Sequence, residues 1–178
     1  AEAFLKDMCR HVAETCPQEV AFFEKFYKSF SGDQLMEMAE KPFTRMTYTE
    51  AVAELKKAKK DFEFPVEWGQ DLQAEHEKYL TDEVFGGAVI VTDYPKDIKP
   101  FYMRANDDGK TVAAMDVLVP RIGEITGGSQ REERYDLLLQ AVEQHDVPAD
   151  ELRWYLELRR WGTCPHAGFG VGFDRLVP

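Results

Sequence analysis

Apolar residues recur three or four positions apart through the first thirty residues of the chain, which is the spacing of one helix face. Pro17 interrupts this pattern, and proline breaks or kinks a helix interior, so the pattern predicts two helices or one kinked helix. The aromatic stripe is expected to pack in the core. Its members are Phe4, Met8, Val12, Phe22 or Phe23, Phe26 and Phe30.

Two further helices are predicted before residue 88. Thr47 and Glu50 have the spacing of a capping box and precede an apolar face, which indicates a short helix whose lysine-rich end is solvated. Asp71 is the expected cap of a second helix that runs to about Val84 and ends at a glycine pair. His76 within that helix is expected to be a surface or partly packed residue without a chemical role.

After Gly87 the pattern changes to runs rich in Val, Ile, Phe and Tyr, which favour strands. The predicted strands are residues 88–92, 101–104, 112–119 and 122–126, the last ending at Gly127–Gly128. Asp108-Gly109 between two extended runs is a hairpin signal. Because short turns join consecutive strands, we expect an α+β fold with an antiparallel sheet of about five strands flanked by helices.

Two more helices are predicted after these strands. Ser129 and Glu132 have the spacing of a second capping box, and apolar residues follow on one helix face. Pro148 suits the first turn of another helix, which should end at Gly162. A last strand is expected after that glycine.

From Gly168 to Phe173 glycine alternates strictly with a bulky apolar residue. In an extended chain Phe169, Val171 and Phe173 would line a core, and the glycines would leave the opposite face bare. Glycine is costly inside a strand, and close approach of another group usually explains it. The spacing fits two interpretations equally. One is tight packing of a neighbouring element, and the other is a floor for a flat heteroaromatic ring with Arg175 at its edge.

The composition excludes several classes of protein. With 178 residues, of which 44% are hydrophobic and 31% charged, the chain can form one ordinary globular core. No apolar run approaches the length of a membrane span, so no membrane association is expected. The formal net charge of −11 argues against wholesale nucleic-acid binding. Three cysteines without metal-ligand spacing favour reduced thiols over a zinc site.

Two charged side chains have unusual positions. Glu124 lies in an otherwise apolar strand, where a carboxylate can coordinate Mg²⁺ that bridges nucleotide phosphates, although the pattern alone favours a glutamate facing water on an edge strand. Arg131 follows a glycine pair in the first turn of a predicted helix, where a cation opposes the helix dipole. It can reach back across the glycines into a pocket, or pair with Glu132 or Asp136.

Three segments carry specific motifs. They are residues 91–104 (VTDYPKDIKPFYMR), 116–134 (DVLVPRIGEITGGSQREER) and 162–176 (GTCPHAGFGVGFDRL). Together they resemble class II aminoacyl-tRNA synthetases of the aspartate/asparagine/lysine group, and the last is similar to motif 3 of that family. The resemblance covers nearly the whole chain and favours the asparagine-specific branch. It implies a partial class II catalytic core, with residues 1–86 as a helical insertion and residues 87–178 as the antiparallel-sheet part.

The resemblance also implies roles for individual residues. Glu124 would contact ATP and its Mg²⁺, with Asp116 as a weaker support, and Arg131 would hold the carboxamide oxygen of asparagine. The residues that match the ATP-contact segment are Gly172, Phe173, Asp174 and Arg175, with Arg175 nearest the nucleotide. His166 is expected to position other groups, because this class activates amino acids by orientation and charge neutralisation without a nucleophilic side chain.

The implied activity is activation of asparagine by ATP to asparaginyl-adenylate and transfer to tRNA(Asn), in a parent protein expected to be cytoplasmic and homodimeric. The sequence contains no counterpart of motif 1, motif 2 or the anticodon-reading OB-fold. We therefore expect a C-terminal part of a catalytic domain that is inactive alone. Three alternatives stay open: an aspartyl-type synthetase, an aspartate-amidating paralogue, and a non-catalytic binding module on the same scaffold.

Overall fold

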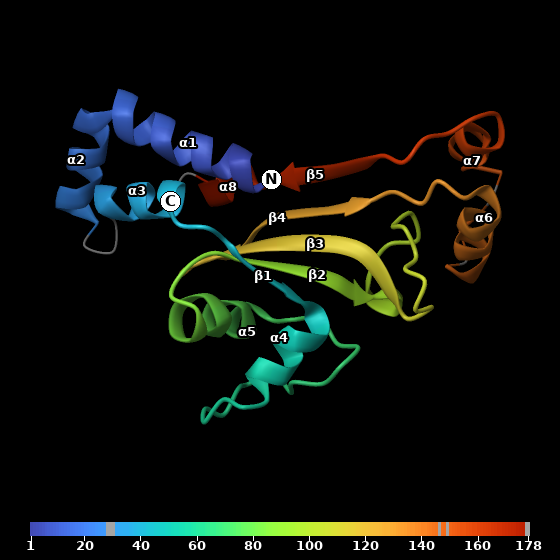
Figure 1. The fold of residues 1–178 in the computed structure, drawn as a ribbon, viewed down its shortest axis with the longest axis horizontal. Coiled ribbons are helices and arrows are strands. Elements are labelled where there is room, and N and C mark those ends of the chain that lie inside the picture. Colours follow the sequence, from blue (N-terminus) through green and yellow to red (C-terminus); the bar gives the residue numbers. More distant parts are fainter. Residues whose placement is uncertain (28–30, 146, 149, 177–178) are drawn as a thin grey trace.

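The computed structural model describes residues 1–27, 31–145, 147–148 and 150–176, and its centre is a five-stranded sheet of order β1-β2-β3-β4-β5 (Figure 1). The strands are β1 (Thr44–Thr47), β2 (Val89–Pro95), β3 (Thr111–Val119), β4 (Gly123–Gln130) and β5 (Ala167–Val171). β1 runs parallel to β2, and the other neighbouring pairs are antiparallel. The predicted α+β class with five strands is confirmed, whereas the parallel β1 was not predicted.

Three helices precede the sheet, namely α1 (Glu2–Thr15), α2 (Pro17–Phe26) and α3 (Gly32–Glu40). Pro17 occupies the first position of α2, where its missing N–H has no helical partner to lose, so the predicted break is confirmed. The three helices form the blue group beside the β4–β5 side of the sheet in Figure 1. From this group Leu5 of α1 is buried against the sheet.

The aromatic stripe of α1 and α2 is not core, and that prediction is wrong. Phe22 and Phe26 are 55% and 61% exposed, and their rings lie 4.5 Å apart, centroid to centroid. Phe4 is also exposed and contacts Phe169 of β5. Helical spacing identifies an apolar face but not what covers it, which explains the error. Phe30 lies outside the described residues.

Each face of the sheet has its own buried cluster. Val91 and Leu118 point to one face, which is covered by α4 (Tyr48–Leu55), α5 (Ala74–Lys78) and the π-helix η1 (Tyr79–Val84). Ile90 and Val117 are their neighbours along β2 and β3 and point to the opposite face, where Leu5 of α1 packs. The helices on the first face lie below the sheet in Figure 1, and α1–α3 lie at its upper left.

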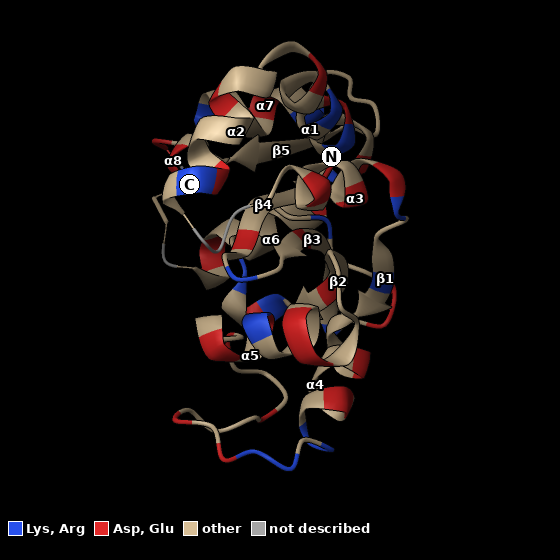
Figure 2. Cartoon of the chain, turned by 90° about the vertical axis from the view of Figure 1, so that its left-hand side faces the viewer, with Lys and Arg blue, Asp and Glu red and all other residues tan. Residues whose placement is uncertain are grey.

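The helices on the first face confirm one predicted cap and contradict another. Thr47 and Glu50 form the predicted capping box of α4, and the lysine-rich segment that follows is exposed and forms the blue stretch at the lower end of Figure 2. The next helix begins after Gln73, not at Asp71. His76 is only 1% exposed, because its Nδ1 accepts the Gln73 N–H and its Nε2 lies 3.2 Å from a backbone carbonyl. The expected surface or partly packed position was therefore wrong.

Residues 101–104 do not form the predicted strand. Met103 makes only an isolated bridge with Arg131, and Ala105 makes one with Val112. The turn at Asp108-Gly109 is present, since Gly109 has a φ of +68° and the Asp108 carboxylate accepts two backbone N–H groups. β4 does not end at Gly127–Gly128 but continues through both glycines to Gln130.

The remaining helices are η2 (Lys96–Ile98), α6 (Tyr135–Gln144), α7 (Arg153–Arg160) and α8 (Phe173–Leu176). Ser129 belongs to β4, and Glu132 lies between β4 and α6, so the second capping box is wrong. Pro148 precedes α7 by several residues and does not lie in its first turn. α6 and α7 pack through Leu138, Val142 and Leu156. None of the helices in the described part of the chain is long and apolar enough to cross a membrane.

Candidate functional site

The glycines of β5 leave an open surface at the edge of the sheet. An added Cβ at Gly170 would meet no atom within 4 Å, whereas at Gly168 it would lie 3.2 Å from Nη2 of Arg131. At Gly172 it would lie 3.6 Å from the aliphatic part of the Arg175 side chain. Among the described residues, no neighbouring element packs against Gly170 on this face of the strand. The bare surface is instead bounded by a guanidinium group at each end.

The bulky residues of the same strand do not line a core, contrary to expectation. Phe169 is 45% exposed and Phe173 is 75% exposed, and Phe173 belongs to α8 and not to the strand. Only Val171 packs partly against a buried cluster. β5 is the last strand of the sheet, and the contact of Phe169 with Phe4 of α1 covers only part of its outer face. Strand alternation correctly predicted which side chains share a face, but not how deeply those side chains are buried.

Arg131 lies directly after β4 and not in a helix, because α6 begins only at Tyr135. Its Nη1 donates to Oγ of Ser129 over 2.8 Å, and its guanidinium lies 5.0 Å from the ring centre of Tyr102. Glu132 pairs with Arg134 instead, and among the described residues no carboxylate forms an ion pair with Arg131. The charge of Arg131 is therefore held by neutral groups and stays available to a ligand.

A cleft of about 330 Å³ opens beside Arg131. Its lining residues are Phe101, Tyr102, Arg131, Leu152, Trp154 and Tyr155. Arg131 is the single charged side chain among them, so a polar group that enters this mostly aromatic cleft has one guanidinium to bind.

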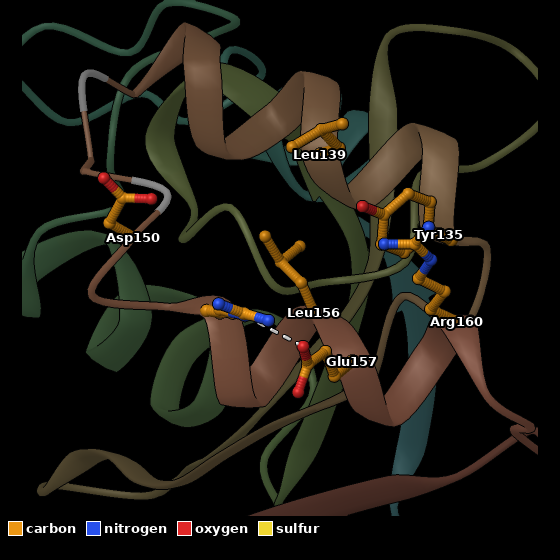
Figure 3. A pocket seen from close by; sticks show the side chains of 7 residues that line it. Tyr135, Leu139, Asp150, Leu156, Glu157 and Arg160 are labelled. Atoms are coloured by element: carbon orange, nitrogen blue, oxygen red, sulfur yellow. Dashed lines mark hydrogen bonds and ion pairs between the residues drawn. The ribbon is translucent and has the colours of Figure 1, made fainter.

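A second cleft of about 230 Å³ lies between α6 and α7 (Figure 3). It contains an ion pair between Arg153 and Glu157 at 2.9 Å, and Arg160 and Asp150 lie at its rim. It shares no lining residue with the first cleft, and no residue predicted for the site lines it.

Two carboxylates converge on the same face of the sheet as the glycines. A Cβ added at Gly127 would lie 2.9 Å from Oε1 of Glu124 and 3.3 Å from Oδ1 of Asp116. Lys99 donates from Nζ to Oδ2 of Asp116 over 2.7 Å. Glu124 does not face water on an edge strand, because β4 lies between β3 and β5. Burial raises the pKa of Glu124, and the charge of Asp116 raises it further.

Arg175 and Glu124 are joined through the backbone. Nη1 of Arg175 donates to the carbonyl oxygen of Glu124, which anchors α8 to β4 while most of the Arg175 side chain remains exposed. Phe173 and Asp174 are exposed next to it, and their side chains form no hydrogen bond or ion pair with the other described residues. The sequence-predicted residues thus gather at the β4–β5 edge, with Arg131 at one end and Glu124 and Arg175 at the other.

Glu77 contacts the candidate site and was not predicted from the sequence. Its Oε2 accepts the backbone N–H of Glu124 over 3.0 Å, and burial raises its pKa. It comes from α5, 47 positions before Glu124, so no local spacing could have revealed the contact. Lys99 and Tyr102 were also missed as separate residues, although both lie in the first of the three motif segments.

The donor set suits a magnesium–phosphate ligand. No group of three or more His, Cys, Asp or Glu side chains in the described chain could hold a metal ion by itself. Mg²⁺ usually takes one or two carboxylates together with phosphate oxygens. Glu124 and Asp116 can supply the carboxylates, and a nucleotide can supply the phosphate oxygens. The edge therefore offers a flat backbone surface, two carboxylates and two guanidinium groups.

Solved structures share the fold of this chain. The asparaginyl-tRNA synthetase of Pyrococcus horikoshii, solved with asparaginyl-adenylate, superposes with a TM-score of 0.87 and 38% identity over 99% of this chain and 38% of its own. The aspartyl-tRNA synthetase of Entamoeba histolytica gives a TM-score of 0.67 and 27% identity over 86% of this chain and 33% of its own.

The chain is also similar in sequence to asparagine–tRNA ligases. An asparagine–tRNA ligase of Geotalea uraniireducens is 59% identical over 177 residues, and one of Picosynechococcus is 56% identical over the same length. Both alignments cover 99% of this chain, which spans 38% of the length of each relative. The family model described as tRNA synthetases class II (D, K and N) matches residues 1–178. The chain therefore belongs to the class II tRNA synthetases of the D, K and N group.

Proposed function

We propose that this chain is the part of an asparagine–tRNA ligase that binds ATP and selects asparagine. The observation that carries the proposal is the glycine surface of β5, with Arg131 at one end and Arg175 at the other. An adenine ring can lie on a strand that has no side chains, and a guanidinium group can stack on the ring or bind phosphate.

In the proposed reaction the carboxylate of asparagine attacks the α-phosphate of ATP in line, and pyrophosphate leaves. Arg131 receives the carboxamide oxygen, because it is the charged group of its cleft and has no acidic partner among the described residues. Arg175 binds the nucleotide at the other end of the glycine surface. Gly172, Phe173 and Asp174 accompany it as the segment that contacts ATP.

Glu124 would hold Mg²⁺ together with phosphate oxygens, with Asp116 as the second carboxylate. The bound metal would neutralise the charge that develops on the phosphates. The negative charges of Glu124 and Asp116 repel one another, and a bound divalent cation would reduce that repulsion. The proposed setting is a cytoplasmic homodimer that acts on tRNA(Asn).

The test uses a chimeric synthetase, in which this chain replaces the 177 matched residues of the Geotalea uraniireducens relative. We expect pyrophosphate exchange that depends on asparagine, with aspartate poorer by about 100-fold or more. Exchange with aspartate at an equal rate would favour an aspartyl-type or aspartate-amidating enzyme. No exchange, under conditions where the unmodified relative is active, would favour a non-catalytic module. The 178-residue chain alone is expected to give none.

A further inference from the structure

Arg159 of α7 is a buried cation without an acidic partner among the described residues. It is 6% exposed, and its hydrogen bonds go to neutral groups. A buried charge is costly unless it is well paired, so a guanidinium held only by neutral groups calls for an explanation. The neighbouring Arg160 on the same helix is exposed.

The contacts of Arg159 converge on the backbone around Arg131. Its Nε donates to the carbonyl oxygen of Glu132 over 3.1 Å, one residue after Arg131. Its Nη2 lies 3.2 Å from Nε2 of His166. The carbonyl oxygen of His166 in turn accepts the backbone N–H of Arg131 over 2.8 Å. Arg159 therefore holds the backbone of Arg131 and Glu132 through two contacts, one directly to Glu132 and one through His166.

The same guanidinium also holds one wall of the Arg131 cleft. It lies 3.9 Å from the ring centre of Tyr155, and Nη2 donates to the Tyr155 hydroxyl over 2.8 Å. Tyr155 and Arg131 both line the cleft. The buried guanidinium of Arg159 thus holds both Tyr155 and the backbone next to Arg131, and both residues face the cleft.

The hydrogen bonds also determine the protonation of His166. Arginine can only donate, so Nε2 of His166 must accept. Nδ1 lies 2.8 Å from the carbonyl oxygen of Cys164, so it must carry the proton and donate. His166 is thus a neutral ring in the Nδ1–H form, locked between Arg159 and the backbone, and it has no free nitrogen to act as a base.

We propose that Arg159 is a positioning residue that fixes Arg131 and Tyr155 for the amino acid side chain, and that His166 transmits this constraint to the strand β5. The proposal rests on the proposed function, since it assigns the cleft beside Arg131 to the amino acid. A purely structural arginine would affect binding of asparagine and ATP alike, whereas a positioning residue affects asparagine selectively.

The functional test compares R159L with R160L in the chimeric synthetase. R159L is expected to raise the KM for asparagine about tenfold or more, because hydrogen bonds to a charged group are lost, while the KM for ATP stays within about twofold. R160L should change neither value. Equal increases in both KM values, or no difference between the two variants, would overturn the proposal.

R159K is the second variant, in case R159L does not fold. Lysine keeps the charge but cannot reach the Glu132 carbonyl and the His166 ring with one planar fork. A selective rise in the KM for asparagine, smaller than that of R159L, is expected. Unchanged kinetics in R159K would count against the proposal even when R159L unfolds.

The structural test needs no activity, so it separates this inference from the proposed function. In the 178-residue chain, ¹⁵N NMR of the His166 ring should show the Nδ1–H form. R159L should lose that preference and exchange the Arg131 amide hydrogen faster, while R160L should match the unsubstituted chain. If the chimera lacks asparagine-dependent exchange, the proposed function fails and these spectra still decide the role of Arg159. An Nε2–H ring in the unsubstituted chain would contradict it.

Discussion

Along β3, Val117 and Leu118 are fully buried on opposite faces of the sheet, whereas along β5 Phe169 and Gly170 are exposed on both. The two strands belong to one sheet and are separated only by β4. The centre gains stability from side chains that helices cover, whereas the edge has an open surface, where we propose that the ligand binds. We therefore expect substitutions in β3 to affect mainly stability and substitutions near β5 to affect mainly activity.

The largest expected effect is on activity at the edge. E124A in the chimeric synthetase should lower kcat/KM for asparagine-dependent exchange about 1000-fold, because a charge-stabilising group is lost. The thermal midpoint should change little, since the contacts of Glu124 to Glu77 and Arg175 use its backbone. E143A on the exposed face of α6 is the matched control. A loss of less than about tenfold would contradict the role given to Glu124.

A substitution in β3, at the centre of the sheet, should lower stability and leave activity unchanged. L118A removes a fully buried side chain and should lower the free energy of unfolding by about 3 kcal/mol. The activity per folded molecule in the chimera should be kept. Urea unfolding of the 178-residue chain measures the loss, with L137A on α6 as a partly exposed control. A loss below about 1 kcal/mol would show that β3 is not the stable centre.

Two glycines of adjacent strands, Gly128 and Gly170, should respond differently to an added Cβ. A Cβ at Gly128 would lie 2.7 Å from Cβ of Phe169 and 2.8 Å from the carbonyl oxygen of Gly168, so G128A should cost about 1–3 kcal/mol. Gly170 has open space, so G170A should change stability by less than about 0.5 kcal/mol. In the chimera G170A should raise the KM for ATP. Equal destabilisation by both variants would contradict the open surface on β5.

The smallest expected effect concerns pH. The pKa of Glu77 is raised in the folded chain, chiefly by burial, so its contribution to stability is present below its unfolded pKa and is lost as the pH rises through the folded pKa. E77Q keeps an oxygen that can accept the Glu124 N–H and removes the charge. We expect E77Q to be more stable than the unsubstituted chain at pH 7 and equally stable at acid pH. A stability difference that does not depend on pH would contradict this.

Local signals predicted much of the fold. Pro17 at the start of α2, the Thr47–Glu50 box and the Asp108-Gly109 turn depend on neighbouring residues alone, and the structure confirms them. The box at Ser129 failed because pairing with β5 keeps that residue in β4. β1 was missed because a four-residue strand gains its stability from β2, far along the chain.

In the candidate site, too, contacts between residues far apart in the chain could not be predicted from the sequence. Motifs in the sequence led to Glu124, Arg131 and Arg175 as candidates, and in the structure they lie around one glycine surface. Glu77 and the partners of Arg159 were not found, because their contacts join segments that the sheet brings together. Burial was the other quantity that periodicity could not supply, as the exposed Phe22 shows.

The side of β5 that faces away from β4 is an open strand edge in the described chain. In the described chain this strand pairs only with β4, so its other row of backbone N–H and C=O groups is available to any extended peptide. Natural edge strands discourage such pairing with lysine or proline, and β5, with the sequence AGFGV, has neither. Purified at high concentration, the chain should associate through this edge, and a short strand-forming peptide added in excess should keep it dispersed.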